Sequence, residues 1–384
     1  MGRFAAVLVL VFTFGLPVWG QWTDDADRCS KISDPDQSLP YCTAAIESGH
    51  LSTANLAITF NNRGNTYDHK GNHDRAIRDY DEAIRLDPTL ALAFRNRGNA
   101  YDDKGNHDRA IRDYDEAIRL NPGYAAAFYD RGLAYRLKGA YDRAIQNYDE
   151  AIRLSPNFVG ALNNRGRVYT IKGDYDRAIQ DYDEAIRQSP NYQFAFYNRG
   201  YAYQEKGDYA HAIEDYDQAI RLNPNDADAF NDRGRLRFYL GQFVAAQPDF
   251  ARALELDSSD TERALWLYLA RSRAGQDARN ELEKNAAQIK LTEWPGPVTS
   301  LYLGKATAEA VLSAAANSDA KMDRAQHCEA YFYLGQHALI AGKSDEATRL
   351  FQQAVDSGVM TSNEYGGAQA ELKRLSASRT HAGH

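Results

Sequence analysis

Long apolar runs and an excess of basic charge are both lacking in this chain of 384 residues. Lys and Arg number 45 against 53 Asp and Glu, which gives a formal net charge of -8 at pH 7. Nucleic acids and anionic lipids attract proteins through clustered basic side chains, so we expect neither as the main partner. Beyond residue 20, no segment approaches the roughly 20 apolar residues that a membrane-spanning helix needs. We therefore expect no transmembrane segment.

The chain also lacks the motifs of catalysis. It contains no phosphate-binding loop, no zinc-ligand spacing and no nucleophile elbow. Five of the nine histidines lie in or beside turns of the repeat described below, or in the last residues of the chain (His69, His73, His107, His381 and His384). We expect a non-enzymatic protein with no cofactor and no bound metal. An incidental metal contact by His69 and His73 is the less favoured alternative.

Residues 1–20 have the pattern of a secretory signal peptide. Arg3 precedes an almost wholly apolar run, and small residues follow it, so we expect cleavage between Gly20 and Gln21. A lipidated protein carries a cysteine directly after the apolar run, whereas the first cysteine of this chain is Cys29. We expect an unlipidated, soluble protein in the bacterial periplasm, with the extracellular space as the alternative.

Cysteine is scarce, with three in the whole chain. An exported protein folds in an oxidising compartment, so we predict a disulfide between Cys29 and Cys42. Closing so short a loop stabilises the fold by about 3 kcal/mol in the loop-entropy estimate. The disulfide would staple residues 21–56 into an amino-terminal cap, in which the segment DQSLPYCTAAIES imitates the second helix of a repeat. For Cys328 we expect a buried, small apolar side chain rather than a reactive thiol.

A glycine within NRG or DRG recurs every 34 residues, at Gly64, Gly98, Gly132, Gly166, Gly200 and Gly234. A second glycine follows seven residues after each of these, at Gly71, Gly105, Gly139, Gly173, Gly207 and Gly241. Apolar residues at three- and four-residue spacing on both sides of the second glycine predict two amphipathic helices, A and B, folded as an antiparallel hairpin. Prolines then stop helix B in five of the copies, at Pro88, Pro122, Pro156, Pro190 and Pro224.

These six copies, residues 57–258, resemble the tetratricopeptide repeat at nearly every position that defines that family. The resemblance implies an all-α fold, a right-handed superhelical solenoid in which hairpins stack because none buries its own apolar face. One departure is regular: arginine replaces the usual leucine before the glycine, at Arg63, Arg97, Arg131, Arg165, Arg199 and Arg233. We predict that each pairs with helix B of its own repeat, at Asp79, Asp113, Asn147, Asp181, Asp215 and Asp249, in preference to forming a ligand-binding arginine ladder.

The strict period fails in residues 259–375, for which we expect irregular helices with a degenerate repeat near 328–361 and a disordered tail at 376–384. This part resembles periplasmic tetratricopeptide lipoproteins of the NlpI type, in which similar segments close the solenoid. The matching segments are Trp266 to Ala270, Tyr302 to Gly304, Tyr331 to Gly335, and Glu364 with Ala368 to Leu372. The resemblance implies an envelope adaptor, often homodimeric, that brings peptidoglycan hydrolases and a processing protease together.

Helix A lines the concave face of stacked hairpins, so its variable positions are the candidate contacts for a ligand. Two residues before each glycine of helix A stand Asn62, Asn96, Asp130, Asn164, Asn198 and Asp232. An asparagine both donates and accepts, so such a row can pair with an extended peptide backbone. The row resembles the asparagine ladder in the tetratricopeptide superhelix of a glycosyltransferase. The alternative is that these are solvated polar residues of the repeat consensus.

Aromatic side chains mark the middle of the same face. Phe194, Tyr197 and Tyr201 fall at i, i+3 and i+7 beside Asn198, and Tyr129 adds apolar surface two repeats earlier. Exposed aromatics on a concave surface are typical binding hot spots. Partial burial against the next repeat is the alternative.

Three functions remain open from the sequence. The favoured one is a non-catalytic scaffold or adaptor that binds peptides or envelope proteins in its concave groove. The second is a chaperone-like holder of extended polypeptides. The third is an enzyme whose site lies in the last third of the chain.

Overall fold

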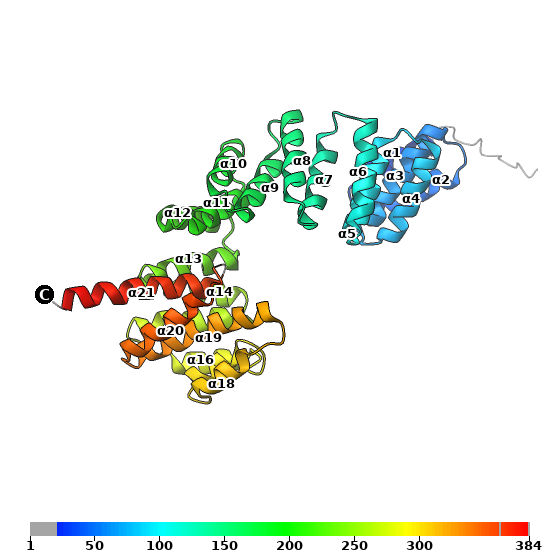
Figure 1. Ribbon diagram of the computed structural model, residues 1–384. Helices are drawn as coiled ribbons and strands as arrows, with labels where there is room; N and C mark the ends of the chain where they lie inside the picture. The colour runs from blue at the N-terminus through cyan, green and yellow to red at the C-terminus, as the bar shows by residue number, and fades with distance from the viewer. Residues whose placement is uncertain (1–20, 361, 383–384) are drawn as a thin grey trace, which may run out of the picture. The chain divides into compact units, whose positions relative to one another are not determined.

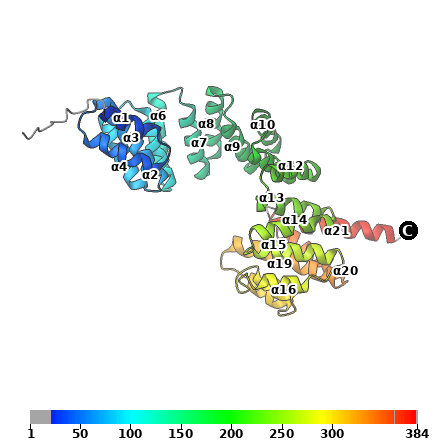
Figure 2. The same ribbon diagram turned by 180° about the vertical axis from the view of Figure 1, so that it is seen from behind.

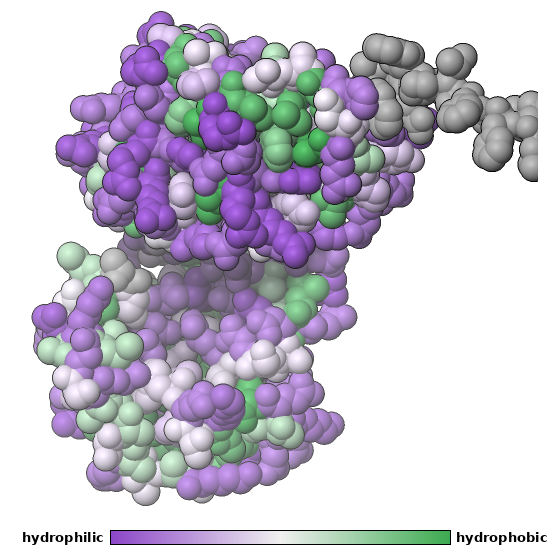
Figure 3. All heavy atoms as spheres, turned by 90° about the vertical axis from the view of Figure 1, so that its right-hand side faces the viewer, coloured by the Kyte–Doolittle hydropathy of each residue, from purple (hydrophilic) through white to green (hydrophobic). Residues whose placement is uncertain are grey.

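The computed structural model describes residues 21–360 and 362–382, and throughout this part of the chain the regular structure is helical. The predicted signal peptide, residues 1–20, lies outside the described residues. The chain divides into two compact units, one ending at Lys172 and the other beginning at Gly173, and each is described by itself (Figures 1 and 2). Figure 3 shows one face of the molecule, on which hydrophilic side chains predominate and apolar side chains form smaller patches between them.

The first unit consists of a helical cap followed by hairpins in register with the repeat. Its helices are α1 (Gln21–Lys31), α2 (Pro35–Glu47), α3 (Thr53–His69), α4 (His73–Leu86), α5 (Ala91–Asp103), α6 (His107–Leu120), α7 (Ala125–Leu137), α8 (Tyr141–Leu154) and α9 (Val159–Ile171). Helices α3, α5, α7 and α9 are the A helices of this unit. Helices α3, α5 and α7 each pack against their own helix B and against the next helix A.

Two kinds of glycine shape each hairpin, as the repeat predicts. Gly71, between α3 and α4, has a φ of 72°, a conformation that a side chain disfavours. Gly64 lies within α3, where a Cβ would stand 2.6 Å from the ring of Tyr80 in α4. Gly71 therefore permits the turn, and Gly64 permits the close approach of α3 and α4.

The predicted disulfide is present in the cap. Cys29 of α1 is bonded to Cys42 of α2, and both side chains are buried. The pair of helices packs on α3, where the hydroxyls of Ser38 and Thr66 share a hydrogen bond of 3.2 Å. The cap thus covers the end of the first hairpin that has no preceding repeat.

The second unit begins with the same hairpins and ends in the irregular helices. Its helices are α10 (Tyr175–Gln188), α11 (Gln193–Glu205), α12 (Tyr209–Leu222), α13 (Ala227–Tyr239), α14 (Phe243–Leu256), α15 (Thr261–Arg273), α16 (Arg279–Ala286), α17 (Gly296–Tyr302), α18 (Ala308–Ala315), α19 (Ala320–Ile340), α20 (Ser344–Asp356) and α21 (Asn363–Ala382). Helices α19 and α20 form a hairpin in which Gly335 faces Phe351, as Gly64 faces Tyr80 in the first repeat.

A single aromatic side chain is central to the core of the second unit. Trp266 of α15 is fully buried, with ring centroids of Phe238, Phe250 and Phe332 at 5.3, 5.8 and 5.3 Å. Cys328 is also fully buried, in agreement with its expected role as a small apolar side chain.

The prediction of a disordered tail from residue 376 is wrong for the part that the structure describes. Helix α21 continues to Ala382, and Figures 1 and 2 show it extending past its neighbours at the end of the chain. No proline or glycine interrupts the sequence between Ala368 and Ala382, and the Ser378 hydroxyl donates to the backbone oxygen of Arg374 one turn earlier at 3.0 Å. The first glycine after this run is Gly383, so the sequence offers no earlier stop.

Candidate peptide-binding site

The predicted arginine pairs are present in the first, second, third, fifth and sixth repeats, where they join helix A to helix B. Arg97 of α5 donates to both carboxylate oxygens of Asp113 at 2.8 and 2.7 Å, and also to Asp81 of the preceding helix B at 2.6 Å. Equivalent pairs within repeats are Arg63 with Asp79, Arg131 with Asn147, Arg199 with Asp215, and Arg233 with Asp249. The arginines are therefore structural links within and between hairpins.

Part of the predicted asparagine row is buried between consecutive A helices and does not face solvent. Asn96 is only 8% exposed and donates to the side chain of Asn61 at 2.9 Å. Asn164 is 7% exposed and donates to the Tyr129 hydroxyl at 3.0 Å. For these two residues the expected solvent-facing position is wrong, because their amides are used in repeat stacking. Asn62 and Asn198 are half-buried.

The same pairing, 35 residues apart, involves two of the predicted aromatic residues. Tyr129 is half-buried against Phe158, with a centroid distance of 4.8 Å, and accepts the bond from Asn164. Tyr197 donates from its hydroxyl to Asp232 at 2.8 Å. These tyrosines thus bridge neighbouring hairpins, as the alternative reading of the sequence held.

The other two predicted aromatics are open to solvent. Phe194 is 54% exposed and Tyr201 is 39% exposed, and both belong to α11. Tyr201 lines a cleft in the second unit that the sequence did not predict. One exposed residue of the predicted aromatic stripe, Tyr201, therefore belongs to a larger cleft.

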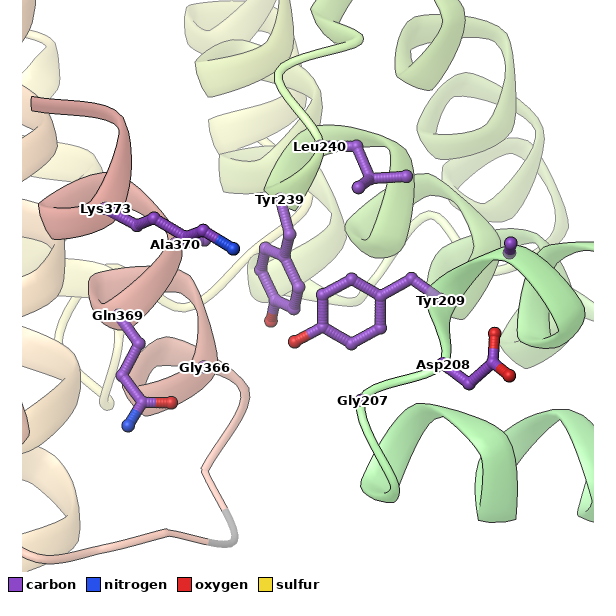
Figure 4. A pocket seen from close by; sticks show the side chains of 10 residues that line it. Gly207, Asp208, Tyr209, Tyr239, Leu240, Gly366, Gln369, Ala370 and Lys373 are labelled. Atoms are coloured by element: carbon purple, nitrogen blue, oxygen red, sulfur yellow. The ribbon is translucent and has the colours of Figure 1, made fainter. Parts of the chain in front are cut away.

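This cleft lies where the turn between α11 and α12 and the end of α13 face the start of α21 (Figure 4). It consists of two adjoining cavities of about 570 and 250 Å³. We call it the tyrosine cleft. The residues common to both cavities are Gly207, Tyr209, Tyr239, Gly366 and Gln369.

Tyr239 of α13 forms the floor of the tyrosine cleft and fixes α21 beside it. Its hydroxyl donates to the backbone oxygen of Asn363 at 2.6 Å, and burial raises the pKa of Tyr239 well above its ordinary value. The ring centroid of Tyr209 lies 6.2 Å from that of Tyr239. Figure 4 shows the two rings beside each other in the cleft. A Cβ on Gly367 would stand 2.7 Å from the Phe332 ring and 3.2 Å from that of Tyr239, so glycine allows α21 to approach this closely.

Two arginines hold the next turns of α21. Arg374 donates to the backbone oxygen of Tyr239 at 2.9 Å, and its guanidinium lies 5.2 Å from the ring centroid of Phe243. Arg273 of α15 pairs with Glu371, which is 1% exposed. The wall of the tyrosine cleft is therefore a firmly docked helix.

The rim of the tyrosine cleft carries both charges and one large apolar side chain. Burial raises the pKa of Glu205, and Lys373 is exposed on the opposite side. Met360, next to the start of α21, is 73% exposed. Together with the amides of Gln204 and Gln369, the cleft offers an aromatic floor and groups that donate and accept hydrogen bonds, as segments of polypeptide require.

A buried carboxyl group lies directly behind this site. Glu364 is 4% exposed, and burial together with the nearby Glu262 and Glu329 raises its pKa to about 8. It accepts hydrogen bonds from Ser362 at 2.8 Å and from Tyr333 at 3.3 Å. A raised carboxyl pKa is typical of general acids, but the burial of Glu364 keeps it from solvent, and its partners give it the role of fixing the start of α21.

Sequence reasoning missed Tyr209, Tyr239 and Gln369. The repeat period contained one usable signal: Tyr239 stands where the five earlier copies have His69, Asp103, Leu137, Ile171 and Glu205. The partner of Tyr239, however, lies more than a hundred residues later in α21, outside any period. Only the packing of α21 on α13 brings the three together.

No helix in the described part of the chain is long and apolar enough to cross a membrane. Models of the tetratricopeptide repeat match residues 57–90, 95–158, 147–180, 166–207, 194–226 and 215–247. Among solved structures, MamA is 28% identical, with 43% of this chain and 96% of that chain covered at a TM-score of 0.40. YrrB, described as a TPR protein with an unusual peptide-binding site, is also 28% identical, with 49% and 95% covered at 0.40.

A tetratricopeptide repeat protein from Parabacteroides merdae is 20% identical, with 65% of this chain and 98% of that chain covered at a TM-score of 0.50, and it shares the fold. The hairpins, the glycine contacts and the repeat models agree along residues 57–90 and 95–247. This chain is therefore a member of the tetratricopeptide repeat family.

Proposed function

We propose that this protein is an extracytoplasmic interaction scaffold that binds a peptide segment of a partner protein in the tyrosine cleft. The observation that carries the proposal is the cleft itself: an aromatic floor, a rim of both charges and an exposed Met360, held open between two docked elements. Buried aromatics surrounded by a polar rim are the usual anatomy of a protein-binding hot spot.

Export to the periplasm is part of the same proposal. The signal-peptide pattern of residues 1–20 supports it, and the Cys29–Cys42 disulfide is of the kind that persists in an oxidising compartment. Envelope hydrolases and a processing protease are the partners that the resemblance of the last third favours. A reporter fused behind residue 50 and active only after export tests the location, and a reporter that stays inactive there contradicts it.

Binding in the tyrosine cleft is tested by site-specific photo-crosslinking in cells that export the protein. The crosslinker replaces Met360 in one sample and Val244 in another, because both are exposed apolar residues of the second unit, 73% and 69% exposed, and only Met360 lines the cleft. We expect a discrete partner at Met360 alone. Equal yields at both positions contradict the proposal.

A second experiment removes one of the two aromatic rings that line both cavities of the tyrosine cleft. Tyr209→Ala is compared with Tyr141→Ala, which changes the same first position of helix B in the other unit. We expect Tyr209→Ala to lose at least 90% of the crosslinked partner, on the order of a hot-spot loss of 2 kcal/mol, and Tyr141→Ala to retain it. Broad crosslinking to unfolded chains in all variants would favour a polypeptide holder instead.

A further inference from the structure

Three metal-binding side chains meet where the first two hairpins adjoin, far in sequence from the tyrosine cleft. Asp68 lies in the last turn of α3, His73 is the first residue of α4, and Asp103 is the last residue of α5. One ligand atom from each lies within 4.8 Å of the others. The His73 Nδ1 is 2.8 Å from a carboxylate oxygen of Asp68.

The next repeat shows which part of this cluster belongs to the fold. Asp102 and His107 repeat the aspartate–histidine pair 34 residues later, with the same contact at 2.6 Å and nearly the same exposure. The pair by itself is therefore a feature of the hairpin turn. The residue that corresponds to Asp103, however, is Leu137. The third ligand is the addition that distinguishes the first site from the second.

The third ligand adds a second carboxylate to the cluster, because a ligand atom of Asp103 lies within 4.8 Å of those of Asp68 and His73. Two carboxylates this close repel one another unless a cation lies between them. A bound divalent cation would remove that repulsion and join α3 and α4 to α5.

We propose that Asp68, His73 and Asp103 bind a divalent transition-metal cation, with Zn²⁺ the best match to one imidazole nitrogen and two carboxylate oxygens. Bonds of about 2.0 to 2.2 Å place tetrahedral ligand atoms roughly 3.4 Å apart. The His73 Nδ1 and the Asp68 oxygen are hydrogen-bonded at 2.8 Å, so a bound cation replaces this bond and the two side chains move slightly apart. Asp103 is exposed, so a rotation of its side chain brings its carboxylate to the cation. Water fills the remaining position. The cation links the first repeat to the second.

The experiment is calorimetric titration of untagged, chelator-treated protein with ZnCl₂, together with thermal unfolding with and without the metal. We expect one equivalent of Zn²⁺ to bind and to raise the Tm. Asp103→Leu reproduces the side chain that the next repeat already tolerates, and we expect it to weaken binding at least tenfold. His107→Ala should leave the affinity unchanged, because the second pair lacks a third ligand.

A gain-of-function variant makes the test decisive. Leu137→Asp supplies the missing carboxylate to Asp102 and His107, and we expect it to add a second equivalent of bound Zn²⁺. Asp103→Asn, which keeps the size of the side chain, replaces Asp103→Leu if the latter does not fold. The proposal is overturned if wild type binds no Zn²⁺, if it binds as tightly as Asp103→Leu and Asp103→Asn, or if His107→Ala removes the site.

Discussion

The guanidinium of Arg63 donates two parallel hydrogen bonds to the carboxylate of Asp79, from Nε at 2.7 Å and from Nη2 at 2.8 Å. Arg63 is 18% exposed at its side chain and Asp79 is 9% exposed. The bond joins helix A to helix B at a position where related repeats carry leucine. At this position a buried ion pair therefore replaces the apolar contact between helix A and helix B.

Removing one partner of such a buried arginine–aspartate pair should lower the stability of the fold. We expect Arg97→Ala to lower the free energy of unfolding by about 2 to 3 kcal/mol, because Asp113, 10% exposed at its side chain, loses both hydrogen bonds and stays buried. Arg85→Ala breaks an exposed ion pair with Glu82 and should cost less than about 0.5 kcal/mol. Urea unfolding followed by circular dichroism measures the free energy of unfolding of both variants. Equal losses would contradict a structural role for the buried arginine–aspartate pairs.

The glycine contact between helices gives a second stability prediction. A Cβ on Gly98 would lie 2.6 Å from the ring of Tyr114, which is itself buried, so Gly98→Ala should destabilise the fold by about 1 to 3 kcal/mol. Gly123→Ala is the control, because its Cβ would meet only the Asn121 side chain at 3.4 Å. A thermal unfolding curve for each variant decides the matter. If the two shift alike, the close approach of α5 and α6 is not what requires glycine.

The repeat made much of the fold predictable, because every hairpin solves the same packing problem with the same residues. Arg97 and Asp113, 16 residues apart, could be paired from the sequence alone, since the period fixed which helix faces carry them. Cys29 and Cys42 could be paired because the chain has few cysteines and they are close in sequence.

The tyrosine cleft could not be predicted in the same way. Its floor, Tyr239, is in register with the repeat, but its wall belongs to α21, whose position depends on contacts such as Arg273 with Glu371 across 98 residues. The asparagine row failed for a different reason. Asn96 and Asn164 face the preceding helix A, and a period within one repeat carries no information on how far a neighbouring repeat covers it.

The cap should depend on its disulfide. Reduction, or Cys29→Ser with Cys42→Ser, should free α1 from α2 and lower the stability of the cap by about 2 to 4 kcal/mol, because the unfolded loop regains its freedom. Hydrogen exchange resolved by segment measures this as faster exchange in residues 24–47, while exchange in α12 stays unchanged and is the internal control. Unchanged protection in the cap of the double variant contradicts the prediction.

Docking of α21 should weaken as the pH rises toward 8 and above. Burial and the carboxylates of Glu262 and Glu329 raise the pKa of Glu364 to about 8, whereas an unfolded glutamate has a pKa of about 4.3. Between these values the folded protein binds the extra proton, so the stability is fully present below about pH 4.3 and is lost as the pH rises through 8. The slope reaches about 1.4 kcal/mol per pH unit.

Glu364→Gln mimics the protonated side chain and should flatten this part of the profile. Glu293→Gln, which changes an exposed glutamate of the same unit, should leave it as in wild type. Thermal unfolding between pH 5 and pH 9, with hydrogen exchange in α21 as the local readout, compares the three proteins. Because Tyr239 joins α13 to the first residue of α21, a loosened α21 also opens the wall of the tyrosine cleft, so partner crosslinking at Met360 should fall over the same pH range in wild type and persist in Glu364→Gln. If the stability of wild type depends on pH in the same way as that of Glu364→Gln between pH 5 and pH 9, a buried, protonated Glu364 does not hold α21 in place.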